Sequence, residues 1–193
     1  MGAERATIDT VAVRKAVADL IRGLGLDPAR DGELADTPER VADFYREALA
    51  GLDPAAEPEL AVMPHAGGGD LVVVRDLPFH SLCIHHLAPF FGHVTVAYLP
   101  AERLIGISGP ARLVGLYSRR LQLQERMTAQ IADHLERLIA PHGVMVRVTA
   151  RHLCMEMRGV RTHGAVETRT VRGALAEPRW AEALRPPPEG ARG

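Results

Sequence analysis

A cysteine and two adjacent histidines stand close together in the stretch "SLCIHHLAPF", residues 81–90. Cys83 and His86 are three positions apart, so a turn or a distorted strand can bring a thiolate and an imidazole to one metal ion. Farther along, "ARHLCMEMRGV" places His152 and Cys154 two positions apart, the spacing of one face of a regular strand. Two cysteines and one histidine favour zinc, and three protein ligands leave a fourth position for the water of a catalytic site.

The same residues also have a purely structural explanation. Lone cysteines often act as small buried hydrophobic residues, and the pair His85–His86 can be a satisfied polar group in a folded chain. A C-x-x-H motif with one distant cysteine is weaker evidence for zinc than two C-x-x-C motifs. From residue types and spacing alone, a zinc site and ordinary packing therefore both remain open.

A second group of residues has the chemistry of a nucleotide site. In "GISGPARLVGLYSRRLQLQERMT", Ser108 and Arg112 lie at or near an expected helix start, where free N–H groups and the helix dipole attract anions. The guanidinium of Arg112 can add a forked contact to phosphate oxygens. Glu125 opens the next expected helix, and a carboxylate can accept the two hydrogen bonds that the guanine edge donates. Taken alone, Glu125 is better explained as a charge that interacts favourably with the helix dipole.

Composition and charge exclude several classes of protein. The chain has 193 residues, of which 47% are hydrophobic, enough to form one domain with a real core. A formal net charge of −1 gives no basic field for nucleic acid, and no run approaches the ~20 apolar residues that span a membrane. Two cysteines without a secretory signal predict a reduced, cytoplasmic protein, in which a disulfide is disfavoured.

Hydrophobic periodicity predicts the elements that must position these residues. Helical spacing predicts helices at residues 9–24, 36–49, 110–121 and 125–140. Alternation predicts strands at residues 70–79, 93–100, 143–155 and 166–175. Asp9 or Thr10 can cap the first helix, and Gly25 can end it. This order predicts an α+β fold in which helices cover one side of an antiparallel sheet.

The same pass along the chain predicts its organisation. We expect an N-terminal helical segment over residues 1–50 and a connecting loop, rich in Pro, Gly and Ala, over residues 51–69. A catalytic domain follows over residues 70–185, and residues 186–193 are expected to be a flexible tail.

Five blocks together resemble the GTP cyclohydrolase I family in order and spacing: "DTPERVA", "CIHHLAPF", "GISGPAR", "YSRRLQLQER" and "HLCMEMRGV". The resemblance implies the tunnelling fold, in which strands of five subunits close a barrel and two rings stack into a homodecamer with sites between subunits. It also implies zinc-dependent opening of the imidazole ring of GTP, release of C8 as formate and rearrangement to 7,8-dihydroneopterin triphosphate, a step of tetrahydrofolate biosynthesis.

The resemblance assigns roles to individual residues. The implied zinc ligands are Cys83, His86 and Cys154. The implied catalytic residues are His85, which protonates the leaving ring nitrogen, and His152, which shuttles protons. The implied contacts to the guanine edge are Gln124 and Glu125, and the implied contacts to phosphate are Arg40, Ser108, Arg112 and Arg158.

Two positions depart from the family pattern. Ile84 stands where the family usually has an acidic residue, and Gly109 and Pro110 follow Ser108 where the family carries a lysine. A charge-assisted contact is worth roughly 1.5–3 kcal/mol, so loss of the lysine weakens triphosphate binding about ten- to a hundredfold unless another group compensates.

These departures leave three interpretations. Arg161 or Arg169 can replace the lost charge in an ordinary GTP cyclohydrolase. Alternatively, a divergent enzyme of specialised metabolism accepts another guanine nucleotide such as GMP, or stops at a ring-opened formamidopyrimidine. Thirdly, the chain can be a ring-forming protein whose zinc only stabilises the fold. The intact pair of His85 and His152 argues against the third interpretation, because a structural zinc site needs no free imidazoles.

Overall fold

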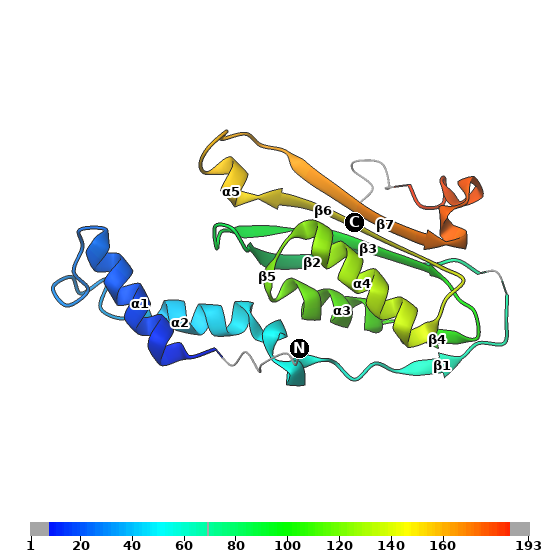
Figure 1. The fold of residues 1–193 in the computed structure, drawn as a ribbon, viewed down its shortest axis with the longest axis horizontal. Coiled ribbons are helices and arrows are strands. Elements are labelled where there is room, and N and C mark those ends of the chain that lie inside the picture. Colours follow the sequence, from blue (N-terminus) through cyan, green and yellow to red (C-terminus); the bar gives the residue numbers. More distant parts are fainter. Residues whose placement is uncertain (1–7, 69, 186–193) are drawn as a thin grey trace.

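The computed structural model describes residues 8–68 and 70–185, so the predicted tail at residues 186–193 lies outside the described residues. Its central element is a five-stranded sheet with the strand order β5-β2-β3-β6-β7 (Figure 1). The strands are β2 (Val72–Cys83), β3 (Pro89–Leu99), β5 (Leu121–Gln122), β6 (Gly143–His152) and β7 (Ala165–Gly173). All neighbours pair antiparallel except β5, which runs parallel to β2. The predicted antiparallel sheet is therefore confirmed.

Two helices, α3 (Gly109–Ser118) and α4 (Gln124–Ile139), cover one face of this sheet (Figure 1). The apolar stripe of α4 is completely buried at Met127, Ile131 and Leu135. Alternate residues of β6 meet the same core because successive strand residues point to opposite faces. These residues are Val144, Val146 and Val148. The one-sided helical layer confirms the α+β class and agrees with the predicted tunnelling fold; the barrel of five subunits stays a prediction.

A helical hairpin of α1 (Thr10–Gly23) and α2 (Thr37–Ala48) extends beyond the sheet (Figure 1). As predicted, Asp9 caps α1 by accepting a hydrogen bond from the backbone N–H of Ala12 at 3.0 Å. Gly25 follows the end of α1 with a φ of 84°, a left-handed conformation that glycine adopts at low cost. No helix in the described ranges has the length and apolar character needed to cross a membrane.

Large apolar side chains remain exposed on this hairpin in the single chain. They are Val11, Leu20, Leu24 and Phe44. Exposed apolar surface of this kind is available for a contact with another protein.

The predicted connecting loop at residues 51–69 contains regular elements. The 3-10 turns η1 (Ala50–Leu52) and η2 (Pro54–Ala56) lie at its start, and β1 (Val62–Pro64) pairs antiparallel with β4 (Arg103–Ile105). The loop prediction was therefore wrong for these residues. A strand of three residues is too short to give an alternation signal in a segment rich in Pro and Ala.

The opposite face of the sheet carries a second, smaller core under η3 (Ala174–Ala176) and η4 (Pro178–Trp180). Buried Arg147 of β6 holds this layer in place by donating hydrogen bonds to the carbonyl of Leu184 at 2.7 Å and to Thr95 Oγ1 at 3.3 Å. A buried guanidinium needs such acceptors, so the C-terminal turns and the sheet stabilise each other.

The end of β6 differs from the prediction. β6 ends at His152, and the short helix α5 (Leu153–Glu156) starts at the next residue, so Cys154 does not share a strand face with His152. The reason lies in the neighbouring strand, because the last paired residues are Phe90 and His152 and β3 offers little backbone beyond them. The chain then forms a helical turn, in which the N–H of Met157 donates to the carbonyl of Leu153 at 2.9 Å.

Gly92 provides a test of the pairing between β3 and β6. A Cβ on Gly92 would overlap the carbonyl oxygen of Thr149 and lie 2.7 Å from the Cα of Ala150. Because both are backbone atoms, we expect Gly92→Ala to destabilise the fold by about 1–3 kcal/mol, measured as a lower Tm at fixed protein concentration. Gly23→Ala is the control, since no atom from outside its own helix and chain neighbours lies within 4 Å of its new Cβ. An unchanged Tm for Gly92→Ala would contradict this pairing.

Candidate metal centre and active site

A tight turn after β2 brings Cys83 and His86 together. The carbonyl of Cys83 accepts hydrogen bonds from the N–H groups of His86 at 3.3 Å and Leu87 at 2.9 Å, and Leu87 adopts a φ of 53°. The N–H of Ile84 donates to the carbonyl of Gln122 at 3.1 Å, which fixes the turn to β5. As a result, Cys83 Sγ lies 3.7 Å from His86 Nδ1. The C-x-x-H spacing thus acts through a turn, as predicted.

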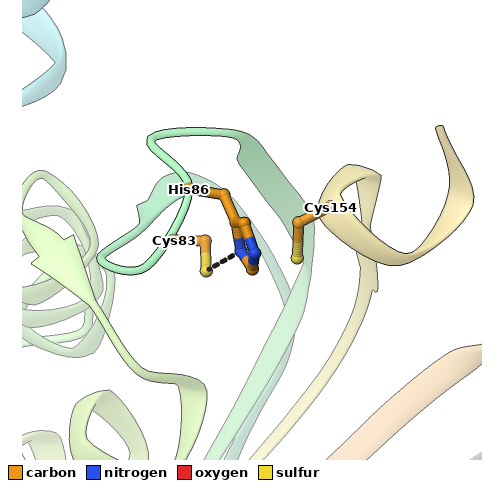
Figure 2. Close-up of side chains that lie close together, drawn as sticks. All are labelled: Cys83, His86 and Cys154. Carbon is orange, nitrogen blue, oxygen red and sulfur yellow. Dashed lines mark hydrogen bonds between the residues drawn. The ribbon is translucent and has the colours of Figure 1, made fainter. Parts of the chain in front are cut away.

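Helix α5 brings Cys154 to the same place from a distant part of the sequence. The ligand atoms of Cys83, His86 and Cys154 all lie within 4.8 Å of one another. Figure 2 shows the three side chains close together, with the His86 ring drawn between the two cysteines and with the turn after β2 and α5 on either side. In the part of the chain that the structure describes, no other group of three His, Cys, Asp or Glu side chains has such spacing. The structure therefore unites the three predicted ligands.

The donor set of this cluster fits a zinc ion. Burial raises the pKa of the Cys154 thiol, and the neighbouring Cys83 sulfur raises it further. Two thiolates at this separation need a cation between them, and zinc binds thiolates at about 2.3 Å and imidazole at about 2.0–2.1 Å. His86 is exposed, so one side of the cluster remains open to water or substrate. That open side is typical of catalytic rather than structural zinc.

Arg158 contacts the far nitrogen of the His86 ring. Its Nη1 lies 2.8 Å from His86 Nε2, and a guanidinium only donates, so Nε2 is the acceptor and the ring proton is on Nδ1. A metal bound through Nδ1 would move that proton to Nε2 and end this contact. The phosphate contact of Arg158 stays a prediction.

His152 is held at the end of β6 by two neighbours. Its ring stacks on Phe90 with a centroid distance of 4.7 Å and an interplanar angle of 5°, and its Nε2 lies 2.7 Å from Gln124 Oε1. Burial lowers the pKa of His152, and the Glu125 carboxylate partly opposes this effect. The environment therefore favours the neutral imidazole, the form that can accept a proton.

The other two predicted residues of the reaction centre lie at the surface. His85 is exposed in the turn after β2, and its ring centroid lies 6.2 Å from that of His86. Glu125 is exposed in the first turn of α4 and is close enough to raise the pKa of His152. Both residues are accessible to a substrate, while their roles stay predictions.

The other three predicted phosphate residues, Ser108, Arg112 and Arg40, lie away from the metal cluster in the single chain. Ser108 and Arg112 line a cavity of about 600 Å³ at the start of α3, together with Arg119. Arg40 is exposed on α2 and forms an ion pair with Asp36 at 3.3 Å. Over residues 8–68 and 70–185, no hydrogen bond or ion pair joins Ser108, Arg112 or Arg40 to the metal cluster. Their phosphate contacts stay predictions.

The departure at Gly109 has a packing counterpart. A Cβ on Gly109 would overlap Cγ1 and Cδ1 of buried Ile105. The side chain of Ile105 therefore fills the space that any side chain at position 109 would need for its first carbon. Of the two arginines considered as replacements for the missing lysine, Arg169 forms an ion pair with Glu167 at 2.8 Å. Arg161 is exposed after α5 with a φ of 47°. The compensation stays a prediction for both.

Two neighbours of His152 were not predicted. Phe90 is part of the quoted motif "CIHHLAPF", but its stacking on His152 follows from the pairing of β3 with β6, which spacing does not reveal. Gln124 was predicted near the guanine edge, whereas the structure shows its side chain buried and bonded to His152.

The two cysteines allow a direct test of the metal centre. They are the only cysteines of the chain, so a thiol reagent reports on this site alone. We expect about one zinc ion per chain, protection of both thiols in the zinc-loaded protein and reaction of two thiols per chain after chelation. Cys154→Ser should lose stoichiometric zinc, while His85→Ala, a change next to a ligand, should retain it. Two reactive thiols in the zinc-loaded protein would contradict the assignment.

Comparison with known proteins agrees with this geometry. The model of the family "GTP cyclohydrolase I" matches residues 13–184. The GTP cyclohydrolase 1 of Thermobifida fusca is 46% identical over 179 residues, which cover 91% of this chain and 86% of the relative. The corresponding protein of Halalkalibacterium halodurans is 44% identical, with 91% and 94% covered, and that of Sinorhizobium fredii is 48% identical, with 83% and 80% covered. The chain belongs to the GTP cyclohydrolase I family.

Proposed function

We propose that this protein hydrolyses the imidazole ring of GTP, releases C8 as formate and forms 7,8-dihydroneopterin triphosphate. The observation that carries the proposal is the cluster of Cys83, His86 and Cys154, with His152 held two residues before Cys154, in a chain that the family matches almost throughout. A pterin product places the enzyme in tetrahydrofolate biosynthesis. Cysteine ligands that must stay reduced suit the cytoplasm.

Three residues of the chain have separate proposed roles in this reaction. When bound, zinc supplies a Lewis acid that activates water for attack on C8. Neutral His152 accepts a proton, and exposed His85 donates one to the ring nitrogen that leaves. Glu125 accepts hydrogen bonds from the ring N–H and the exocyclic amine of guanine. This contact holds C8 toward the metal.

The triphosphate requires positive charge and free N–H groups. The start of α3, with Ser108 and Arg112 beside a cavity, offers both. Arg40 and Arg158 are further candidates, and Arg40 would have to meet the site across a subunit boundary because it lies on the extended hairpin. The exposed apolar side chains of α1 and α2 support such an assembly, which we propose to be a homodecamer with sites between subunits.

A second candidate substrate is a guanine nucleotide with fewer phosphates, such as GMP. One observation favours it: Ile105 fills the space beside Gly109, where the family carries a lysine. The same protein would then lack one phosphate contact while retaining the metal cluster and Glu125. A reaction that stops at the ring-opened formamidopyrimidine is the corresponding alternative for the product.

Product analysis separates these candidates. Zinc-loaded protein is incubated in parallel with GTP, GDP, GMP and dGTP, and products are identified by mass spectrometry. We expect formate and a pterin triphosphate from GTP, neither from protein stripped of zinc, and neither from His152→Ala, which should still bind zinc. A preference for GMP or a pyrimidine product would favour the second candidate. Formate from none of the nucleotides would contradict both.

Recognition of guanine can be tested at Glu125. A hydrogen bond to a charged group contributes about 1.5–3 kcal/mol, so we expect Glu125→Gln to raise the KM for GTP about ten- to a hundredfold. Inosine triphosphate lacks the exocyclic amine, so the wild type should discriminate against it and Glu125→Ala should not. Glu33→Gln is the control, because Glu33 is an exposed carboxylate far from Glu125 in the sequence. Equal discrimination by wild type and Glu125→Ala would place the base elsewhere.

A further inference from the structure

The buried side-chain amide of Gln124 connects α4 with two strands and with His152. Gln124 is 2% exposed, and its Nε2 lies 3.0 Å from the carbonyl oxygen of Val148 and 2.9 Å from that of Val166. The same nitrogen lies 3.2 Å from Thr168 Oγ1. On its other side, Gln124 Oε1 lies 2.7 Å from His152 Nε2. All polar atoms of this amide therefore have partners within the protein.

The two main-chain carbonyls determine which way the amide points. Carbonyl oxygens only accept hydrogen bonds, so the atom that faces Val148 and Val166 must be the NH₂ group. A flipped amide would place its oxygen against two carbonyl oxygens and leave buried acceptors without donors, which costs about 1–3 kcal/mol for each group. Gln124 Oε1 must therefore face His152.

A pair of threonine hydroxyls supports the same orientation. Thr128 Oγ1 donates to the main-chain carbonyl of Gln124 at 2.7 Å, so its own oxygen is free to accept. The hydroxyl of Thr168, 2.7 Å away, can then donate to Thr128. Its remaining lone pair faces Gln124 Nε2, which makes Thr168 a third acceptor for the amide.

This orientation fixes the tautomer of His152. Gln124 Oε1 has only lone pairs to offer, so His152 Nε2 must carry the proton. In a neutral imidazole the other nitrogen, Nδ1, then holds the lone pair. We infer that Gln124 is a positioning residue that keeps this tautomer, with the proton of the His152 ring on Nε2 and the free lone pair on Nδ1.

The tautomer of His152 follows from hydrogen bonds alone. Only its effect on turnover rests on the proposed function. The positioning role also differs from the base contact that the family resemblance predicts for Gln124. A base contact requires an accessible amide, whereas this amide is buried and bonded on both sides.

The tautomer is measured directly by nitrogen NMR. Zinc-loaded protein labelled with ¹⁵N-histidine is studied in the solid state, at a pH at which the ring is neutral, and the signals of residue 152 are those absent from His152→Asn. We expect a protonated Nε2 and an unprotonated Nδ1, and a mixture of tautomers in Gln124→Met. A protonated Nδ1 in the wild type would overturn the inference, whether or not the protein turns over GTP.

Kinetics test the consequence for turnover. General acid–base catalysis contributes about 10²–10⁴-fold, so we expect Gln124→Met to lower kcat by about tenfold or more, with KM and zinc content unchanged. Thr168→Val, a milder change that removes one amide contact, should lower kcat less, and it stands in for Gln124→Met if that variant does not fold.

Gln130→Met is the matched control, because Gln130 is a glutamine of the same helix. Its Oε1 accepts a hydrogen bond from Gln122 Nε2 at 2.8 Å and not from His152. Gln130→Met should leave kcat unchanged. A raised KM with unchanged kcat in Gln124→Met would overturn the positioning role and favour a base contact. An equal loss of kcat in Gln130→Met would also overturn it, because it would indicate a general effect on the helix.

Discussion

The pairing of β3 with β6 is the constraint on which the site depends. Ten residue pairs join these strands, from Leu99 and Gly143 at one end to Phe90 and His152 at the other. A shift of one residue would turn every side chain of β6 to the opposite face, which would take His152 away from both Phe90 and Gln124. Because β3 begins just after the turn that carries His86, the same pairing sets the distance between that turn and Cys154 on α5. The metal cluster is thus a consequence of strand register.

The polar groups beneath the site are tolerated because they form a closed network. Burying an unpaired amide or imidazole costs free energy, and a partly satisfied network is worse than an apolar core. Here the Gln124 amide meets two main-chain carbonyls, and the His152 ring meets both an amide oxygen and an aromatic face. Such a network fixes the direction of each group, so that the His152 imidazole is already oriented in the single chain. Rigidity of this kind is what a preorganised site requires.

The layers of the fold and the cluster of Cys83, His86 and Cys154 could be predicted from the sequence, whereas their local geometry could not. Long periodic segments such as β6 and α4 gave clear signals, and two cysteines with one histidine limited the choice of metal. The change from strand to helix after His152 was not predictable, because it depends on where the neighbouring strand β3 begins. The burial of Gln124 was missed for a similar reason, since its partners Val148 and Val166 belong to other strands. The three-residue strand β1 was too short to leave a pattern.

We expect two sulfurs and one imidazole to bind a single zinc ion and to leave one coordination position open. X-ray absorption at the zinc edge of the purified, zinc-loaded protein measures this coordination. We expect two sulfur neighbours at about 2.3 Å and two lighter neighbours, a nitrogen and an oxygen, at about 2.0–2.1 Å. A spectrum with only nitrogen and oxygen around the metal, or with four sulfur neighbours, would contradict it.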